Sequence, residues 1–217
     1  MREASTLALR KQSLRREMLA RRRELMMEDL QEASHAMTEA VRAHAWWQEA
    51  RGVAAFVGVR GEPDTRALLA ATLAAGKQLW LPRVLGKGRM CFWQLDELES
   101  LQEGRMGLLE PPARGEGIQA PGPADGVDLV LVPGLAFDLR GARLGFGAGH
   151  YDRAFGPQRE AGEAMAKRCG MCLSPFVLDP GVIPMQVHDI RMNAVVTEHG
   201  WSRRVEALGQ PSEGAGR

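Results

Sequence analysis

Apolar residues recur every three or four positions near the start of the chain, and this spacing predicts two helices. Leu7, Leu14 and Met18 fall on one stripe of a helix expected over residues 5–25, a stretch without glycine or proline. A second helix is expected over residues 28–50. Its inner face is formed by Ala33, Met37, Ala40, Val41 and Trp47. The chain therefore begins with a helical segment whose apolar side can pack against a core.

Short apolar runs separated by turn residues follow this segment and predict buried strands. We expect strands at residues 53–59, 78–84, 90–95, 127–132, 167–173 and 194–197. Helices are expected at residues 65–75 and from His150 to about residue 163, the second of them broken at Gly156 and Pro157. Residues 104–126 are dense in glycine and proline and predict an ordered surface connection.

Strands that alternate with helices are typical of an α/β fold. The sequence predicts a single domain over residues 1–208, with a mainly parallel sheet flanked by helices and the N-terminal helical segment packed on it. Residues 209–217 are expected to form a disordered tail. Ligands bind at the carboxyl ends of the strands in such sheets. The loops at residues 60–65, 133–152 and 184–189 follow predicted strands, so we expect them to converge on one cleft.

Composition narrows the class of protein. The chain has 217 residues, of which 45% are hydrophobic and 25% charged, as in a globular domain with a full core. No apolar run is long enough to span a membrane, and no apolar signal segment follows the N-terminal charges, so a cytoplasmic location is expected. We also expect the protein to be a monomer. The net charge of +1 argues against broad nucleic-acid binding. Cys91, Cys169 and Cys172 are expected to remain reduced thiols.

Three glycines at alternate positions carry the clearest chemical signal. Gly145, Gly147 and Gly149 follow the predicted strand at 127–132, and Arg143 and Arg153 flank them. Alternating glycines let bare backbone fold around an anion and direct several N–H groups at it. The spacing is not that of the dinucleotide fingerprint or the Walker loop, and glycine-rich hairpins without a ligand also show it. With the flanking cations, the loop indicates a phosphate site.

Charged residues elsewhere could complete such a site. Lys11 lies on the apolar stripe of the first helix, where a lysine must extend outward or meet an anion, and Arg15 lies one turn on. The remaining arginines of that helix, Arg22 among them, are expected on a solvated face. Asp152 and Asp189 together suit magnesium bridging nucleotide phosphates, although either alone could be a cap or an ion-pair partner.

Other candidates have plainer interpretations. Taken alone, Glu62 is an ordinary turn acid. His150 and His188 could act as acid–base groups, but neither has a nucleophile at diagnostic spacing, so a hydrolytic triad is not expected. Aromatic residues on the predicted strands, Trp80 and Phe92 among them, are expected in the core.

Five segments together resemble the 5-formyltetrahydrofolate cyclo-ligase family, also called methenyltetrahydrofolate synthetase. They are KQSLRREMLARR (residues 11–22), FVGVRGEPDT (56–65), LLEPP (108–112), VPGLAFDLRGARLGFGAGHYDR (132–153) and IPMQVHDIRMNAVVT (183–197). The segments occur in order over nearly the whole chain, and the glycine loop ending in YDR is specific to the family. Two positions depart from its pattern, which usually has aromatic residues there, often tyrosine. Phe146 keeps an aromatic ring without the hydroxyl, and His150 is the larger change.

The resemblance implies a ligase that uses ATP and Mg²⁺ to convert 5-formyltetrahydrofolate to 5,10-methenyltetrahydrofolate, releasing ADP and phosphate. ATP would phosphorylate the formyl oxygen, and N10 of the folate would then attack the formyl carbon. This chemistry needs positioning and charge neutralisation rather than a protein nucleophile. By resemblance, Lys11, Arg143 and Arg153 would stabilise charge. Two alternatives remain open at this point: a paralogue with the same ATP site and another substrate, and a non-catalytic nucleotide- or RNA-binding module.

The resemblance also assigns residues. ATP would be bound by Lys11, Gln12, Ser13, Leu14, Arg15, Arg143, Leu144, Gly145, Phe146, Gly147, Ala148, Gly149, His150 and Tyr151. The folate, with or without a polyglutamate tail, would contact Val57, Glu62, Phe146, Gly147, Ala148, Gly149 and His150. Magnesium would be held by Asp152 and Asp189.

Overall fold

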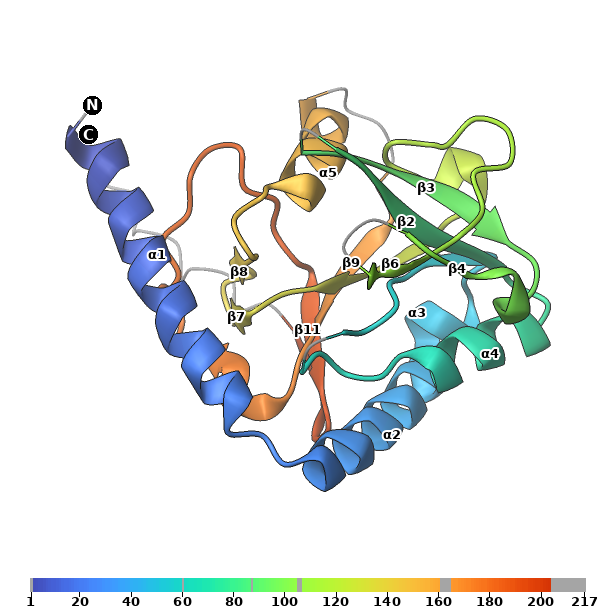
Figure 1. The fold of residues 1–217 in the computed structure, drawn as a ribbon, viewed down its shortest axis with the longest axis horizontal. Helices are drawn as coiled ribbons and strands as arrows, with labels where there is room; N and C mark the ends of the chain where they lie inside the picture. Colours follow the sequence, from blue (N-terminus) through green and yellow to red (C-terminus); the bar gives the residue numbers. More distant parts are fainter. Residues whose placement is uncertain (1, 60, 87, 105–106, 161–164, 204–217) are drawn as a thin grey trace, which may run out of the picture.

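A seven-stranded sheet runs through the centre of the molecule (Figure 1). The computed structural model describes residues 2–59, 61–86, 88–104, 107–160 and 165–203. Within these ranges the strand order is β12-β11-β9-β6-β1-β2-β3. The strands are β1 (Gly52–Ala54), β2 (Gln78–Gly86), β3 (Arg89–Leu95), β6 (Leu129–Pro133), β9 (Lys167–Met171), β11 (Ala194–Thr197) and β12 (Gly200–Arg203).

The pairing within this sheet confirms the predicted α/β class. All pairs between β11, β9, β6, β1 and β2 are parallel, and only the edge strands β12 and β3 pair antiparallel with their neighbours. A parallel strand is covered on both faces, so it consists of continuous apolar residues. In β6, the side chains from Leu129 to Val132 are all fully buried. Strand β6 is also the middle strand of the sheet, and the chain continues from it through two short strands to the glycine loop.

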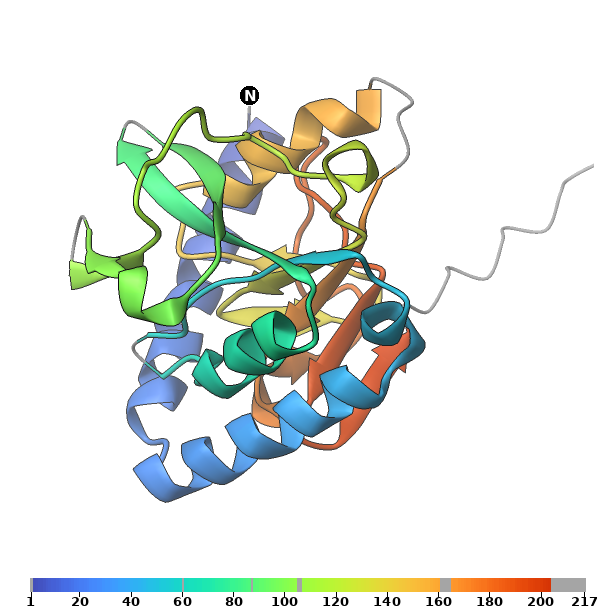
Figure 2. The same ribbon diagram turned by 90° about the vertical axis from the view of Figure 1, so that its right-hand side faces the viewer.

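The α-helices lie at different places around the sheet. They are α1 (Arg2–Arg23), α2 (Met27–Ala43), α3 (Ala45–Gln48), α4 (Arg66–Ala74) and α5 (His150–Glu160). Figures 1 and 2 show α2, α3 and α4 together along one side of the sheet, while α1 runs beside the short strands β7 (Ala136–Asp138) and β8 (Arg143–Leu144). Helix α2 packs on β11, and its residues Ala33, Met37 and Val41 are buried as predicted. In the described residues no helix is long and apolar enough to cross a membrane.

Two small sheets were not expected from the sequence. One is formed by β10 (Val177–Leu178), β7 (Ala136–Asp138) and β8 (Arg143–Leu144), and the other by β4 (Gln102–Glu103) and β5 (Leu109–Glu110). Strands of two or three residues are too short to show a periodic pattern. The first of these sheets matters for function, because β8 ends where the glycine loop begins.

Some predicted boundaries are wrong, each for a local reason. The helix expected over residues 28–50 is two helices, since His44 is extended and its ring accepts a hydrogen bond from the Trp46 N–H at the start of α3. The strand expected over residues 53–59 ends at Ala54. Beyond it, the Thr65 hydroxyl lies 2.5 Å from the Phe56 carbonyl and 3.2 Å from the Gly58 nitrogen, so backbone groups there bond to Thr65 instead of a strand.

Helix α5 also departs from expectation, because it continues through Gly156 and Pro157 to Glu160. Proline has no N–H, so it leaves the carbonyl four residues before it without the usual helical donor. That carbonyl belongs to Arg153, and the Gln119 side-chain amide lies 3.1 Å from it and donates in place of the missing N–H. The predicted tail at residues 209–217, and the domain boundary at residue 208, lie outside the described residues.

Candidate functional site

A cavity of about 780 Å³ opens at the carboxyl ends of the parallel strands. Pockets of this size enclose most of a small-molecule ligand. Its walls include Val59 and Glu62 from one loop, the glycine loop from another, and Asp189 from a third. The prediction that these three loops converge on one cleft is therefore confirmed. Further lining comes from Ala8, Lys11 and Arg15 of α1, from Pro82, Val84 and Met90 of β2 and β3, and from Leu108, Leu109 and Glu110 beside them.

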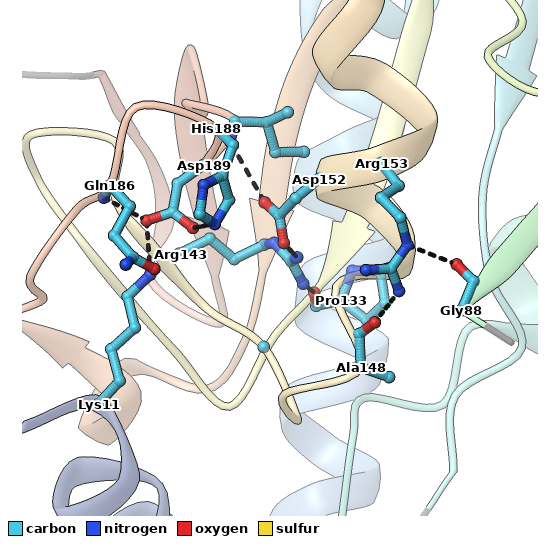
Figure 3. A network of polar contacts seen from close by, with 12 residues as sticks. Lys11, Gly88, Pro133, Arg143, Ala148, Asp152, Arg153, Gln186, His188 and Asp189 are labelled. Atoms are coloured by element: carbon cyan, nitrogen blue, oxygen red, sulfur yellow. Dashed lines mark hydrogen bonds and ion pairs between the residues drawn. The ribbon is translucent and has the colours of Figure 1, made fainter. Parts of the chain in front are cut away.

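Helix α1 directs two cations into this pocket. Lys11 is 7% exposed, and its Nζ lies 2.5 Å from Oδ2 of Asp189 (Figure 3). The lysine on the apolar stripe has thus met an anion, supplied by a residue distant in the sequence. Arg15 lies one turn further on and donates from Nε to the Gly145 carbonyl over 2.8 Å. The other α1 candidates do not line the pocket: Gln12 and Ser13 are exposed, and Leu14 packs against the core.

The glycine loop bends where two of its glycines adopt positive φ, +107° at Gly147 and +67° at Gly149. L side chains rarely adopt such a backbone, so the alternating glycines are required by the path of the loop. Residues 145–149 all line the pocket, and the Phe146 side chain is 52% exposed there. Leu144 is fully buried in the core, so it anchors the loop instead of facing a ligand.

Arg143 and Asp152 form a second ion pair in the pocket wall. Nη2 of Arg143 lies 2.9 Å from Oδ2 of Asp152, and Nη1 donates to the Pro133 carbonyl over 3.2 Å. The other oxygen of Asp152 accepts from the Ile190 N–H. Figure 3 shows this pair close to the pair of Lys11 and Asp189. Two carboxylates and two cations therefore stand together at the end of the glycine loop.

The donor set in this part of the pocket suits a hard cation that also binds phosphate. Asp189 accepts from the Gln186 N–H over 2.6 Å, and His188 Nε2 lies 3.9 Å from its other oxygen. No group of three or more metal-ligating side chains occurs within the described ranges. Zinc sites use such groups, whereas magnesium takes one or two carboxylates and completes its shell with phosphate and water. Asp152 and Asp189 fit the second case.

Glu62 is buried in the pocket wall, so it is no ordinary turn acid. Its side chain is 6% exposed, and one oxygen accepts a hydrogen bond from the Val59 N–H over 3.3 Å. Burial raises the pKa of Glu62 to about 7, although nearby Arg22 and Arg143 and the Val59 hydrogen bond oppose the shift. The carboxyl group therefore changes its charge near neutral pH. Val57, which the resemblance also assigns to the folate, lines the pocket as well.

The residues at the start of α5 complete the wall. His150 lines the pocket, and partial burial, together with the charges of Arg153 and Arg143, lowers its pKa, so the ring is neutral at neutral pH. Tyr151 is buried, with its ring over the Arg143 guanidinium. Arg153 reaches back to the carbonyls of Gly88 and Ala148 (Figure 3). Its guanidinium thereby ties the turn between β2 and β3 to the glycine loop.

The prediction that Arg22 lies on a solvated face is wrong. Arg22 is 7% exposed, and it donates to the Gly134 carbonyl. Its position could have been found from spacing, because residue 22 lies one turn beyond the buried Met18 on the same stripe. The pocket wall formed by β2, β3 and β5 was also missed, since Leu108 and its neighbours lie in a segment without periodicity.

Comparisons with known proteins agree on one family. Residues 8–198 match the model of the 5-formyltetrahydrofolate cyclo-ligase family. A 5-formyltetrahydrofolate cyclo-ligase of Saccharomyces cerevisiae is 32% identical over 181 residues, 77% of this chain and 85% of that protein. The mouse 5-formyltetrahydrofolate cyclo-ligase is 28% identical and covers 90% of this chain and 97% of its own. The NMR structure of Aquifex aeolicus 5,10-methenyltetrahydrofolate synthetase has a TM-score of 0.74 at 30% identity, covering 94% of this chain and 98% of that one.

Proposed function

Because the chain belongs to the 5-formyltetrahydrofolate cyclo-ligase family, we propose that its pocket binds ATP and 5-formyltetrahydrofolate together and closes the folate ring. The activity is the ATP-dependent conversion of 5-formyltetrahydrofolate to 5,10-methenyltetrahydrofolate, with ADP and phosphate as the other products. One observation carries the assignment of the site. The pairs Lys11–Asp189 and Arg143–Asp152 stand beside the glycine loop in a single cavity. This arrangement is suited to bind a nucleoside triphosphate.

We assign the nucleotide to the side of the pocket formed by α1 and the glycine loop. Lys11, Arg15 and Arg143 supply positive charge there, and the backbone of residues 145–149 lies along the same wall. Charge-assisted contacts to phosphate are about twice as strong as neutral ones, so these three cations hold the triphosphate in place. Arg153 adds its charge at the rim, where it also orders the loop.

Asp152 and Asp189 would hold the magnesium ion that accompanies ATP. When bound, magnesium neutralises phosphate charge and fixes the orientation of the triphosphate. The protein's own share is to supply two carboxylates whose positions are set by Arg143 and Lys11.

The folate is assigned to the side with Val57 and Glu62. A carboxylate accepts hydrogen bonds from the N–H groups along the edge of an amino-pyrimidine ring, as in the pterin of a folate. Glu62 is buried, so the ring is bound away from water. Phe146 and His150 line the pocket between this acid and the nucleotide side, and they would face the formyl group.

The reaction needs two transfers and no protein nucleophile. The formyl oxygen attacks the terminal phosphorus of ATP, and ADP leaves. N10 of the folate then attacks the formyl carbon, the C–O bond to phosphate breaks, and N10 loses its proton. Lys11 and Arg143 neutralise the charge of the transferring group, and the pocket holds the two substrates in line. Because His150 is neutral at neutral pH, it contributes shape and hydrogen bonding rather than charge.

We further propose that the enzyme acts as a cytoplasmic monomer on small molecules. The cysteines Cys91, Cys169 and Cys172 are free, as in a reducing compartment. The near-neutral net charge of +1 supports a small-molecule substrate over nucleic acid. A polyglutamate tail on the folate would extend from the open side of the pocket.

Turnover of 5-formyltetrahydrofolate tests the proposal. The purified protein is mixed with the folate, and methenyl product is followed by its absorbance with MgATP, with ATP and a chelator, and with MgADP. We expect product only with MgATP, in a one-to-one ratio to the ADP formed. Binding of MgATP without methenyl product would instead support a paralogue with another acceptor.

A further inference from the structure

Arg22 lies behind the pocket wall and reaches it through two other side chains. Its guanidinium does not line the pocket, whereas Glu62 and Phe146, which both lie near it, do. The arginine comes from the last turns of α1, and it donates to the Gly134 carbonyl just after β6. The buried guanidinium of Arg22 thus lies close to the Gly134 carbonyl, the Glu62 carboxyl group and the Phe146 ring.

The contact with Glu62 is electrostatic. Nη1 of Arg22 is 4.0 Å from Oε1 of Glu62, and the two side chains are only 4% and 6% exposed. Both Nε and Nη1 of Arg22 are buried without a hydrogen-bond partner. Other groups that act on this acid are Arg143 from β8, Tyr151 from α5 and the Val59 N–H. Arg22 is the cation with the largest effect on the Glu62 carboxyl.

The contact with Phe146 is a cation–π contact, with the guanidinium over the aromatic ring. The Arg22 carbon Cζ lies 5.7 Å from the centre of the Phe146 ring and 5.4 Å from the centre of the Phe176 ring. Phe176 is fully buried, while Phe146 is half exposed on a loop between two glycines. A planar cation stacks on aromatic faces, and a lysine does not replace it there. Phe176 thus supports Arg22, and Arg22 supports Phe146.

We propose that Arg22 is a positioning residue for the folate side of the pocket, holding the Glu62 carboxylate and the Phe146 ring against the same bound pterin. The proposal rests on the assignment of the folate to Glu62. It goes beyond that assignment, because it names a residue that touches neither substrate and sets the geometry of two that do. Misplacing groups of this kind by a fraction of an ångström to an ångström is costly in rate.

The first test needs no substrate. The pKa of Glu62 is measured by NMR titration of the carboxyl carbon in protein labelled at glutamate, with Glu62→Gln identifying the signal. We expect Arg22→Met to raise this pKa above the wild-type value, because it removes a cation. Arg22→Lys keeps the charge and should leave the pKa close to that of wild type. Arg23→Met is the control, since Arg23 is an exposed neighbour on the same helix.

The second test is kinetic. Arg22→Met and Arg22→Lys should both raise the KM for 5-formyltetrahydrofolate by about tenfold or more, because both remove the guanidinium that contacts the Phe146 ring. The KM for ATP should change little. Phe146→Leu should raise the folate KM as well, and adding Arg22→Lys to it should have little further effect. This pair carries the test if Arg22→Met does not fold.

The results separate the two proposals. If the Glu62 pKa shifts in Arg22→Met but the wild-type enzyme fails to convert 5-formyltetrahydrofolate, Arg22 still positions Glu62, and the folate is rejected as the substrate. An Arg22→Met protein that matches Arg23→Met in both the Glu62 pKa and the folate KM would overturn the positioning role.

Discussion

At the scale of single residues, Gly88 shows how an absent side chain supports the pocket. Its φ is +74°, and a Cβ placed there would lie 2.0 Å from Nη2 of Arg153. Arg153 uses that space to donate to the carbonyls of Gly88 and Ala148. The glycine is therefore needed both for the turn and for the contact that ties the turn to the glycine loop.

Replacing Gly88 by alanine should loosen the glycine loop. The added methyl group displaces the Arg153 guanidinium, so we expect ATP affinity, measured by calorimetry, to fall about three- to tenfold, as for one or two lost hydrogen bonds. Gly76→Ala is the matched control, because Gly76 has a φ of +69° and nothing within 4 Å of its Cβ position. Both variants should lose about 1 kcal/mol of unfolding free energy from backbone strain. Equal ATP affinity in the two would contradict the role of this contact.

At the scale of elements, α1 is held against the loops by polar contacts as well as by its apolar stripe. Lys11 pairs with Asp189, and Arg15 bonds to Gly145, so the middle of the helix contacts two of the three loops of the cleft. The buried Met18 lies on the same stripe. The helix is thus a wall of the site, and a change in its partner loop should affect both stability and ligand binding.

Asp189→Asn should show both effects. The loss of one carboxylate should raise the magnesium concentration needed for half-maximal activity, and Asp152→Asn should do the same. Because Lys11 and Asp189 are nearly buried, at 8% and 11% side-chain exposure, Asp189→Asn should also lower the free energy of unfolding in urea by about 1–3 kcal/mol. Asp64→Asn is the control, since its pair with Arg66 is exposed and contributes little. An unchanged magnesium titration in both pocket variants would reject the metal assignment.

At the scale of the whole molecule, the site is built at a cost to stability. A buried carboxyl group is stable mainly in its neutral form, and the pKa of Glu62 is raised to about 7 from an ordinary value of 4.5. The folded protein therefore retains a proton that the unfolded chain releases. Below the unfolded pKa the group makes its full contribution to stability, and this contribution is lost as the pH rises through the folded pKa.

Glu62→Gln should remove this pH dependence. The difference in unfolding free energy between the variant and wild type should grow in favour of the variant between about pH 5 and about pH 8, by up to about 3 kcal/mol. Urea unfolding at several pH values measures it. A difference that stays constant with pH would show that Glu62 is ionised in the folded protein throughout. Folate turnover should be lost in the same variant if Glu62 binds the pterin.

Much of the fold and part of the site could be predicted before the structure was known. The apolar run that forms β6 and the alternating glycines after it are local patterns. Such patterns predict whether their own segment is a buried strand or a loop. The stripe on α1 likewise placed Lys11 on the inner face. Boundaries were less predictable, because His44 and Thr65 end or divert an element through hydrogen bonds that periodicity does not show.

The sequence by itself determined the order of the main parallel strands and the longer helices, the apolar face of α1 and the glycine path of the loop, since these depend on side chains close together along the chain. The tertiary structure decided which charges meet. Lys11 and Asp189 are 178 positions apart, and Arg22 is buried in contact with Phe146 and Phe176, which lie far from it along the chain. Desolvation of a charged group depends on everything packed around it, so the ionisation of Glu62 and the role of Arg22 follow only from the folded molecule.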